Sequence, residues 1–479
     1  IALVLTGAGA TLDGFTGSVL CDGNTTCCHA GTIYKETPAD RDEGGVLEIV
    51  GTGKLATGYR GNYTLMLPNG EDLTFKRIVL TNKVMFAVGP GATVKTDELK
   101  TYSKDDYLIF AGGRLVVPNG EAFADVSLRN DFYASQIGTP EGAAGTNVLA
   151  SGMTFIIDRG IAFDGTFRML SGSKVTHTGA DSTDSALYRA NFSAGGFVLE
   201  SGASVDVSAL GYPVAQGPGR PVDDGKTDRS GSHGGLAHDV GSVRAYGSIS
   251  RPTTLGSGGK NGKGGGATHI TVSGHSVING KILSDGQSSC RLAGAGGSVW
   301  LETGTLEGAS TGVISANGGT DSASHEFYSG AGGRIAVTLT DAGADFSQYK
   351  GKICAKGGVG FLTAGNVRTC YGAGDGTVYL RKGGEQENAG TLLVDGDARC
   401  VNADNYTDIS AVMTECTVGH VVITNGGNPY VRRGATLGVR ESFVNASQHQ
   451  GDRVNGEPSD GVLPAGAIAF VDKTVEATV

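Results

Sequence analysis

Long apolar runs and an excess of basic residues are both missing from this sequence. No stretch approaches the roughly 18 consecutive apolar residues of a membrane-spanning helix, so we expect no transmembrane segment. Lysine and arginine number 38 against 48 aspartates and glutamates, which gives a net charge of −10. A nucleic-acid or anionic-membrane partner calls for a basic surface, and this charge balance argues against both.

Helix-forming patterns are also scarce. Glycine supplies 81 of the 479 residues, and each glycine costs a helix interior about 1 kcal/mol relative to alanine. Proline is limited to 12 residues and no Gly-X-Y period exists, so the chain is not collagen-like. The 39% hydrophobic content is too high for a disordered glycine-rich linker. Alternating apolar windows such as RIAVTL and THITVSG are frequent, and they predict an all-β protein.

Two short phrases alternate along residues 281–398. The first phrase occurs as KILSDGQ, GVISANGG, GKICAKGG and TLLVDGDA, starting at residues 281, 312, 351 and 391. The second occurs as GGSVWL, GGRIAV and GDGTVYL, starting at residues 296, 332 and 374. Like phrases lie roughly 30 to 43 residues apart, and such a period built from strand-forming residues is typical of a solenoid.

This period predicts a parallel β-helix (a β-solenoid) with little or no α-helix, in which each coil pairs its strands with those of the next coil. Alternate residues of each strand should point into one core, namely Val299, Leu301, Ile335, Val337, Val378 and Leu380. Glycines and the Asn-Gly steps at 69, 119, 261, 279, 317, 425 and 455 are expected at corners that need positive φ. A β-propeller is the alternative, but propeller blades usually repeat aromatic signatures and this chain has one tryptophan, Trp300.

Three longer stretches carry a resemblance to a known group of proteins. GSGGKNGKGGGATHITVSG, GAGGSVWLETGTLEGASTGVISANGG and GAGGRIAV resemble the glycine-rich β-helix repeats of large bacterial surface and autotransporter-passenger proteins. The resemblance covers residues 190–400 well and the ends poorly. It implies a secreted, right-handed parallel β-helix displayed outside the cell, and it brings no catalytic motif.

Composition divides the chain into three regions. Residues 1–50 hold an N-terminal strand pattern and a cysteine-containing cap or loop. Residues 51–400 carry the predicted β-helix, interrupted by a long glycine-rich loop at 211–266. Residues 401–479 supply the C-terminal rungs and a terminal strand. Loops as long as 211–266 are usually functional or disordered, which makes this segment the first place to look for a site.

Cysteines and glycosylation sequons both fit an extracellular location. The spacing of the eight cysteines lacks the close pairs of a zinc site, and an even count favours disulfides over the alternative of free buried thiols. The equal spacings favour Cys354–Cys370 and Cys400–Cys416, which leaves Cys21, Cys27, Cys28 and Cys290 for longer links. Candidate glycosylation sites follow the N-x-[ST] rule at Asn24, Asn62, Asn191, Asn405 and Asn445.

A polysaccharide-active enzyme is the main functional alternative, because it would use acidic residues on such a scaffold. A glycosidase needs two carboxylates on one face, and a lyase needs a Ca²⁺ site with a basic residue nearby. The acidic candidates are Asp223, Asp224 and Asp228 in the long loop, the first two beside Arg220 or Lys226, and also Asp158 and Asp164. In a glycine-rich loop these residues are more often turn formers, so we expect no catalytic or cofactor site and keep Ca²⁺ as the one metal candidate.

His233 and His238 are a second candidate for metal binding. They lie five residues apart in SHGGLAHD, but no third ligand follows at a suitable spacing. We therefore expect no metal at these histidines.

The sequence favours a structural or adhesive extracellular protein over an enzyme. The apolar segments IALVLTG and GAIAFVDKTVEATV predict strands at both ends, and open strand edges template further pairing. We therefore expect self-association into a head-to-tail filament on the cell surface, with Cys21, Cys27 or Cys28 reaching a neighbouring copy. The alternatives are a lyase or glycoside hydrolase, and a monomeric surface adhesin that contacts cell-surface glycans.

Overall fold

A computed structural model of the chain describes most of the sequence, and the account below is limited to those residues. They are 1–21, 31–40, 44–51, 64–66, 73–82, 84–88, 93–101, 106–110, 114–116, 123–124, 126–129, 140–141, 148–151, 154–156, 161–177, 179, 189–220, 229–237, 245–289, 292–320, 329–364, 367–396, 406–409, 415–427, 429–431, 436–446, 467–470 and 476–478. Within these ranges the elements are β-strands and one short 3₁₀ turn, Pro38–Asp40. The predicted all-β class is confirmed.

The chain divides into two compact units. Unit 1 comprises Ile1–Thr176 and Ala190–Ser204, and unit 2 comprises His177–Arg189 and Val205–Val479. The strand β18 (Ser204–Asp206) lies at the boundary.

Unit 1 contains three ladders of strands between which the chain passes back and forth. The first runs β1 (Ala2–Val4), β2 (Ile33–Glu36), β3 (Val46–Val50), β5 (Leu73–Thr81), β7 (Thr93–Thr101), β9 (Arg114–Val116) and β12 (Pro140–Glu141). The second runs β4 (Thr64–Met66), β6 (Met85–Val88), β8 (Asp106–Phe110), β11 (Val126–Arg129), β14 (Thr154–Ile156) and β16 (Lys174–Thr176). The third runs β10 (Phe123–Ala124), β13 (Val148–Ser151), β15 (Ile161–Met169) and β17 (Ala190–Leu199). Pairing is parallel throughout except between β2 and β3.

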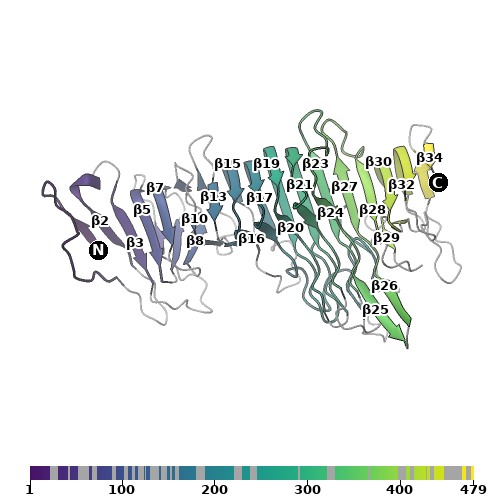
Figure 1. The fold of residues 1–479 in the computed structure, drawn as a ribbon, viewed down its shortest axis with the longest axis horizontal. Helices are drawn as coiled ribbons and strands as arrows, with labels where there is room; N and C mark the ends of the chain where they lie inside the picture. Colours follow the sequence, from purple (N-terminus) through teal and green to yellow (C-terminus); the bar gives the residue numbers. More distant parts are fainter. Residues whose placement is uncertain are drawn as a thin grey trace. The chain divides into compact units, whose positions relative to one another are not determined.

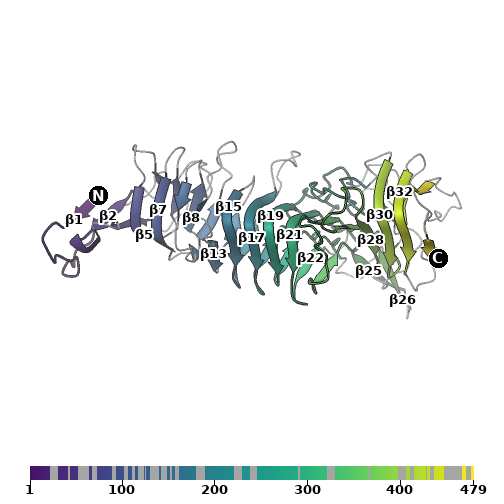
Figure 2. The same cartoon turned by 90° about the horizontal axis from the view of Figure 1, so that it is seen from above.

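Unit 2 has one main sheet and a narrower second sheet (Figures 1 and 2). The main sheet runs β19 (Ala267–Ile278), β21 (Ser298–Glu307), β23 (Arg334–Leu339), β27 (Thr377–Arg381), β28 (Thr391–Asp395), β30 (Glu415–Thr424), β32 (Thr436–Asn445) and β33 (Ala467–Phe470), with β34 (Glu476–Thr478) also on β32. The second sheet holds β20 (Lys281–Leu283), β22 (Val313–Ser315) and β24 (Lys352–Cys354). Two small pairs are β25 (Val359–Ala364) with β26 (Val367–Gly372), and β29 (Thr407–Asp408) with β31 (Pro429–Tyr430).

The repeated phrases pair with one another as the sequence predicts. In the main sheet Val299 aligns with Ile335 and Ile335 with Val378, all in parallel. In the second sheet the copies KILSDGQ, GVISANGG and GKICAKGG of the first phrase align in parallel, each through its central isoleucine. The side chains of Val299 and Ile335 are fully buried. Alternate residues of a strand face the same side, so Leu301 and Val337 share this buried face.

The fourth copy of the first phrase breaks the predicted array. TLLVDGDA forms β28, which joins the main sheet antiparallel to β27 instead of extending the second sheet. Its buried residues Leu392 and Val394 are fully shielded, and Leu392 packs with Tyr379 in a cluster on the other face of the strands. Leu380, predicted to be a core residue, is only half-buried there. The prediction of a continuous parallel ladder through residue 398 is therefore wrong, because the sheet changes its buried face at β27.

A layer of glycine-rich segments forms a further part of the interior of unit 2. We call it the glycine layer, and it comprises residues 211–219, 229–237, 254–266, 285–289, 292–297, 316–320, 329–333, 355–358 and 373–376. Its segments are joined by main-chain hydrogen bonds, such as Gly265 N–H to the Ala295 carbonyl at 2.8 Å. A Cβ atom on Gly264 would lie 1.8 Å from the Gly256 carbonyl oxygen, closer than any real contact. At such a glycine a side chain is excluded because two main chains touch.

The glycines of this layer do not serve the purpose expected from sequence. Among the described glycines of the layer, Gly217 alone has positive φ, at 101°. Of the described Asn-Gly steps, Asn425–Gly426 alone has positive φ at both residues, 52° and 83°. The expectation that glycines mark corners of positive φ is therefore wrong for most of unit 2, where close approach of main chains is the reason for them.

Residues 211–219, 229–237 and 254–266 of the predicted long loop belong to this layer, and the segment 229–237 crosses successive repeats. Gly231 N–H donates to the Ala293 carbonyl at 3.1 Å, and Gly234 N–H donates to the Gly332 carbonyl at 3.0 Å. Further along, the Leu236 carbonyl accepts a 2.7 Å bond from the N–H of residue 374. Residues 229–237, which we call the crossing segment, are therefore part of the packed scaffold.

Candidate functional site

The candidate site lies where the chain leaves the second sheet. Register pairing aligns the ends of β20, β22 and β24, and main-chain bonds extend the alignment back to residues 207–209. The residue two positions beyond each strand end is polar. These residues form a row, which we call the polar row: Ser208, Asp285, Asn317 and Lys356.

The side chains of the first three members of the polar row each accept a hydrogen bond from the main chain of the next member. Asp285 N–H donates to Ser208 Oγ at 3.2 Å, and Asn317 N–H donates to Asp285 Oδ1 at 2.6 Å. Lys356 N–H then donates to Asn317 Oδ1 at 2.8 Å. The row satisfies N–H groups at a corner where strand pairing has ended.

Asp285 is the half-buried carboxyl of the row. Its Oδ2 also accepts a 3.1 Å bond from Ser315 Oγ. Burial raises the pKa of Asp285, the hydrogen bonds from Asn317 and Ser315 oppose the rise, and the nearby Asp206 adds to it. The carboxyl is thus held by its bonds in a place that disfavours its charge.

The row ends in an ion pair whose carboxylate is held by two further hydrogen bonds. Lys356 Nζ lies 3.6 Å from Asp395 Oδ2. Asp395 Oδ1 accepts two 2.7 Å bonds, from Thr424 Oγ1 and Asn425 Nδ2. Asn425 is in the left-handed region and precedes Gly426 in a tight turn. The sequence therefore positions the carboxylate through a turn in the neighbouring strand connection.

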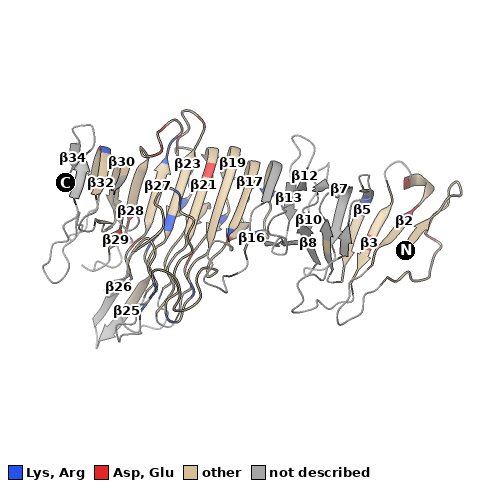
Figure 3. Ribbon diagram, turned by 180° about the vertical axis from the view of Figure 1, so that it is seen from behind, with Lys and Arg blue, Asp and Glu red and all other residues tan. Residues whose placement is uncertain are grey.

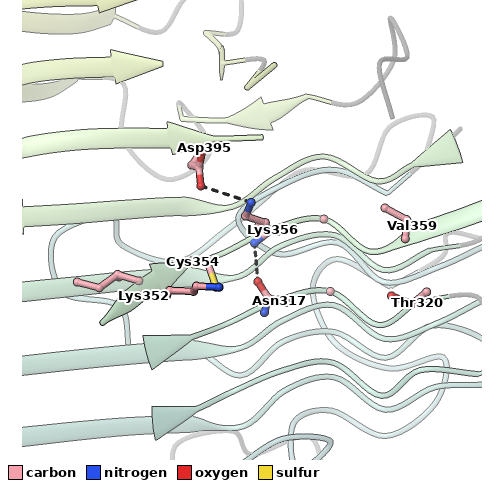
Figure 4. A pocket seen from close by; sticks show the side chains of 10 residues that line it. Asn317, Thr320, Lys352, Cys354, Lys356, Val359 and Asp395 are labelled. Atoms are coloured by element: carbon pink, nitrogen blue, oxygen red, sulfur yellow. Dashed lines mark hydrogen bonds and ion pairs between the residues drawn. The ribbon is translucent and has the colours of Figure 1, made fainter. Parts of the chain in front are cut away.

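A pocket of about 580 Å³ opens beside this ion pair. Figure 4 shows Asp395, Lys356 and Asn317 linked to one another near the middle of the view. Lys352 and Cys354 lie on one side of them, and Thr320 and Val359 lie on the other. Two lysines against one aspartate give the lining a charge of +1, whereas the whole chain carries −10. Elsewhere on the described strands of unit 2, charged residues of both signs are scattered (Figure 3).

Cys354 contributes a protonated thiol to the pocket. Burial raises the pKa of Cys354, the Asn317 side chain opposes the rise, and the carboxylate of Asp285 adds to it. Because the thiolate is the reactive form, the thiol is a weak nucleophile at neutral pH. The pocket can therefore hold a ligand through hydrogen bonds and charge, and its cysteine is poorly suited to covalent chemistry.

The cysteines whose side chains are described, Cys21 and Cys354, are both free. The expected Cys354–Cys370 bridge is therefore not formed. Residue 370 lies on β26, in a hairpin that projects away from the sheets (Figure 1), so a short spacing in sequence does not bring it to β24. The expected Cys400–Cys416 pair and Cys27, Cys28 and Cys290 lie outside the residues whose side chains are described.

His233 is a packing residue of the crossing segment. Its Nδ1 lies 2.8 Å from the Gly296 carbonyl oxygen, and its Nε2 lies 2.8 Å from Thr254 Oγ1. Burial, together with the positive charge of Arg334, lowers the pKa of His233 to about 3. Both ring nitrogens are used within the fold, so His233 is not available as a ligand. His238 lies outside the described residues.

Most of the acidic candidates lie outside the described residues. Asp158, Asp223, Asp224, Lys226 and Asp228 lie outside the described residues, as does the side chain of Asp164 on β15. Arg220 is exposed at the end of the described part of its loop. Among the residues whose placement is described, no group of three or more His, Cys, Asp or Glu side chains could hold a metal ion. No described helix is long and apolar enough to cross a membrane.

The candidate glycosylation sites are seen in part. Asn191 lies on β17, and its side-chain oxygen is buried without a hydrogen-bond partner. Asn445 ends β32 and is half-buried. The side chains of Asn24, Asn62 and Asn405 lie outside the described residues.

The pocket was missed from sequence although its signal was present. The residue before glycine in the first phrase changes from Asp285 to Asn317 to Lys356 to Asp395, while its neighbours stay apolar or small. A variable polar position inside an otherwise uniform phrase indicates a row of side chains on one edge of the stacked strands.

Comparison with known proteins adds no relative. No family model matches the chain, and no match is found among the curated proteins or the solved structures.

Proposed function

We propose that this chain is an extracellular structural protein whose alternating sheets close into a right-handed parallel β-helix. The order of elements between residues 267 and 376 supports the proposal. Each repeat contributes a strand of the main sheet, a strand of the second sheet and a segment of the glycine layer, in that order. Three faces in a fixed order are what one coil of a β-helix requires.

The glycine layer gives the strongest support for a structural role. It devotes a large share of unit 2 to main-chain contacts that no side chain can enter, such as the approach of Gly294 to the Lys263 carbonyl. Close-packed interiors deform little and transmit strain. The resemblance of the repeated phrases to surface-protein repeats supports a place outside the cell, where a stiff support is useful.

We further propose that copies of the chain associate head to tail into a filament. Among the described strands, β1 pairs with β2 alone. Tyr34 N–H donates to the Ile1 carbonyl and Leu5 N–H to the Glu36 carbonyl, so by alternation the main chain of Val4 faces away from β2. Ile1 and Val4 are 54% and 48% exposed, which adds apolar surface to an edge that can accept a strand.

Electron microscopy of the purified full chain tests this arrangement. We expect filaments, and we expect Val4→Pro to abolish them, because proline removes the outward N–H while the bonds to β2 are kept. Val4→Thr is the matched control, since it retains the N–H and should still assemble. A chain that stays monomeric at high concentration, or Val4→Pro filaments equal to wild type, would rule out assembly through this edge.

A further inference from the structure

We propose that the pocket beside the polar row binds a hydroxylated carboxylate, the chemistry of a uronic-acid residue in an acidic glycan. This inference concerns a site on unit 2 and does not depend on filament formation. The pocket has a volume of about 580 Å³, which falls within the usual range of small-molecule sites.

The ion pair at the end of the polar row is arranged to receive a hydroxyl group. At 3.6 Å, Lys356 Nζ and Asp395 Oδ2 are too far apart for a direct hydrogen bond. A sugar hydroxyl donates and accepts at once, so it can bridge an ammonium and a carboxylate at this separation. Thr424 and Asn425 hold the carboxylate in place before any ligand arrives, which reduces the cost of ordering on binding.

Lys352 supplies the contact for a carboxylate. It is exposed at the rim of the pocket, on the strand that also carries Cys354. Its charge gives the lining a surplus of one positive charge, because Lys356 is already opposed by Asp395. An anionic group on the ligand would neutralise that surplus at the rim, where solvent weakens the attraction without removing it.

The remaining lining residues suit a sugar ring. Asn317 and Thr320 offer an amide and a hydroxyl, which are typical orienting groups in ligand sites. Ile353 and Val359 add apolar surface for the C–H face of a ring. Inorganic phosphate shares the negative charge but lacks this face and the carbon-bound hydroxyl groups.

Isothermal titration calorimetry of the full chain with trigalacturonate tests the proposal. We expect saturable binding, weakened about fivefold by Lys352→Gln, as for loss of one exposed charge contact. Lys281→Gln is the matched control: Lys281 occupies the same register position on β20, is exposed and does not line the pocket. The control should bind as wild type does, and thermal melts should show both variants folded.

Two further titrations separate sugar recognition from attraction of any anion. The methyl ester of trigalacturonate, which keeps the hydroxyl groups and loses the charge, should bind as weakly to wild type as the acid binds to Lys352→Gln. Inorganic phosphate should neither bind measurably nor compete. Equal binding of acid and ester, an unchanged affinity in Lys352→Gln, or competition by phosphate would each overturn the proposal.

Discussion

Unit 2 is packed in two different ways, by side chains between its sheets and by main chains in its glycine layer. In the sheets, Ile335 and Val337 are fully buried and fill space with branched side chains. In the layer, the space beside Gly294 is filled by the carbonyl of Lys263. The two faces therefore differ in the substitutions they tolerate: a side-chain core accepts exchanges of similar volume, whereas a main-chain contact accepts no Cβ.

The sharpest test of this difference is Gly294→Ala. The new Cβ would lie 1.8 Å from the Lys263 carbonyl oxygen, and the other nearest atoms are also backbone atoms of Lys263 and Gly264, which cannot move aside as the end of a side chain could. We expect a loss of more than about 4 kcal/mol in the free energy of unfolding, at the extreme of single substitutions, measured by denaturant titration.

Gly343→Ala is the matched control for that variant. Gly343 has φ of 78°, and no atom lies within 4 Å of the place that an alanine methyl group would take. The change therefore costs only left-handed strain of about 1–2 kcal/mol. Similar losses for the two variants would contradict the account of the glycine layer.

Ile335→Ala probes the side-chain core at a fully buried position. We expect a loss of about 2–5 kcal/mol in the free energy of unfolding, and only about 0.5–1.5 kcal/mol for Ile335→Val, because the cost follows the cavity that is left. Denaturant midpoints of the two variants measure this gradation. A valine variant as unstable as the alanine variant would show that this core is as intolerant as the glycine layer.

His233 should make unit 2 sensitive to acid. Its pKa is about 3 in the fold against 6.5 when unfolded, so between these values the unfolded chain binds more protons. The contribution to stability is complete above pH 6.5 and is lost as the pH falls toward 3. Thermal melts across this range should show the decline, and it should be shallower in His233→Gln. Parallel pH profiles for the two proteins would contradict it.

Asp285 should show a smaller effect of opposite sign. Its pKa is raised in the fold, so the folded chain holds the proton to higher pH and this group's contribution to stability falls as the pH rises above 3.8. Asp285→Asn keeps the oxygen that accepts the Asn317 N–H and removes the half-buried charge. We therefore expect the free energy of unfolding at pH 7 to rise, as measured by denaturant titration. A clear loss of stability would show that the charge itself supports the polar row.

The alternating apolar residues of the two phrases were sufficient to predict the strands and their parallel register, because burial of one face fixes a strand's pairing. They could not predict β28, whose phrase matches the earlier copies but whose Leu392 packs against Tyr379 on the other face. Glycine doublets were misinterpreted because a corner and a main-chain contact select the same residue. His233 carried no local signal of burial, since the residues that enclose it, Thr254 and Gly296, come from other segments.

The crossing segment has a consequence for how unit 2 comes apart. Stacked repeats ordinarily interact only with their neighbours, so they can fray one repeat at a time from either end. Residues 229–237 instead bond to Ala293, Gly332 and residue 374, which belong to three successive repeats. Unfolding of any one repeat would remove hydrogen-bond partners from the crossing segment, which contacts all three repeats. Unfolding of this region should therefore be a single cooperative event, with hydrogen exchange in its repeats proceeding at one common rate.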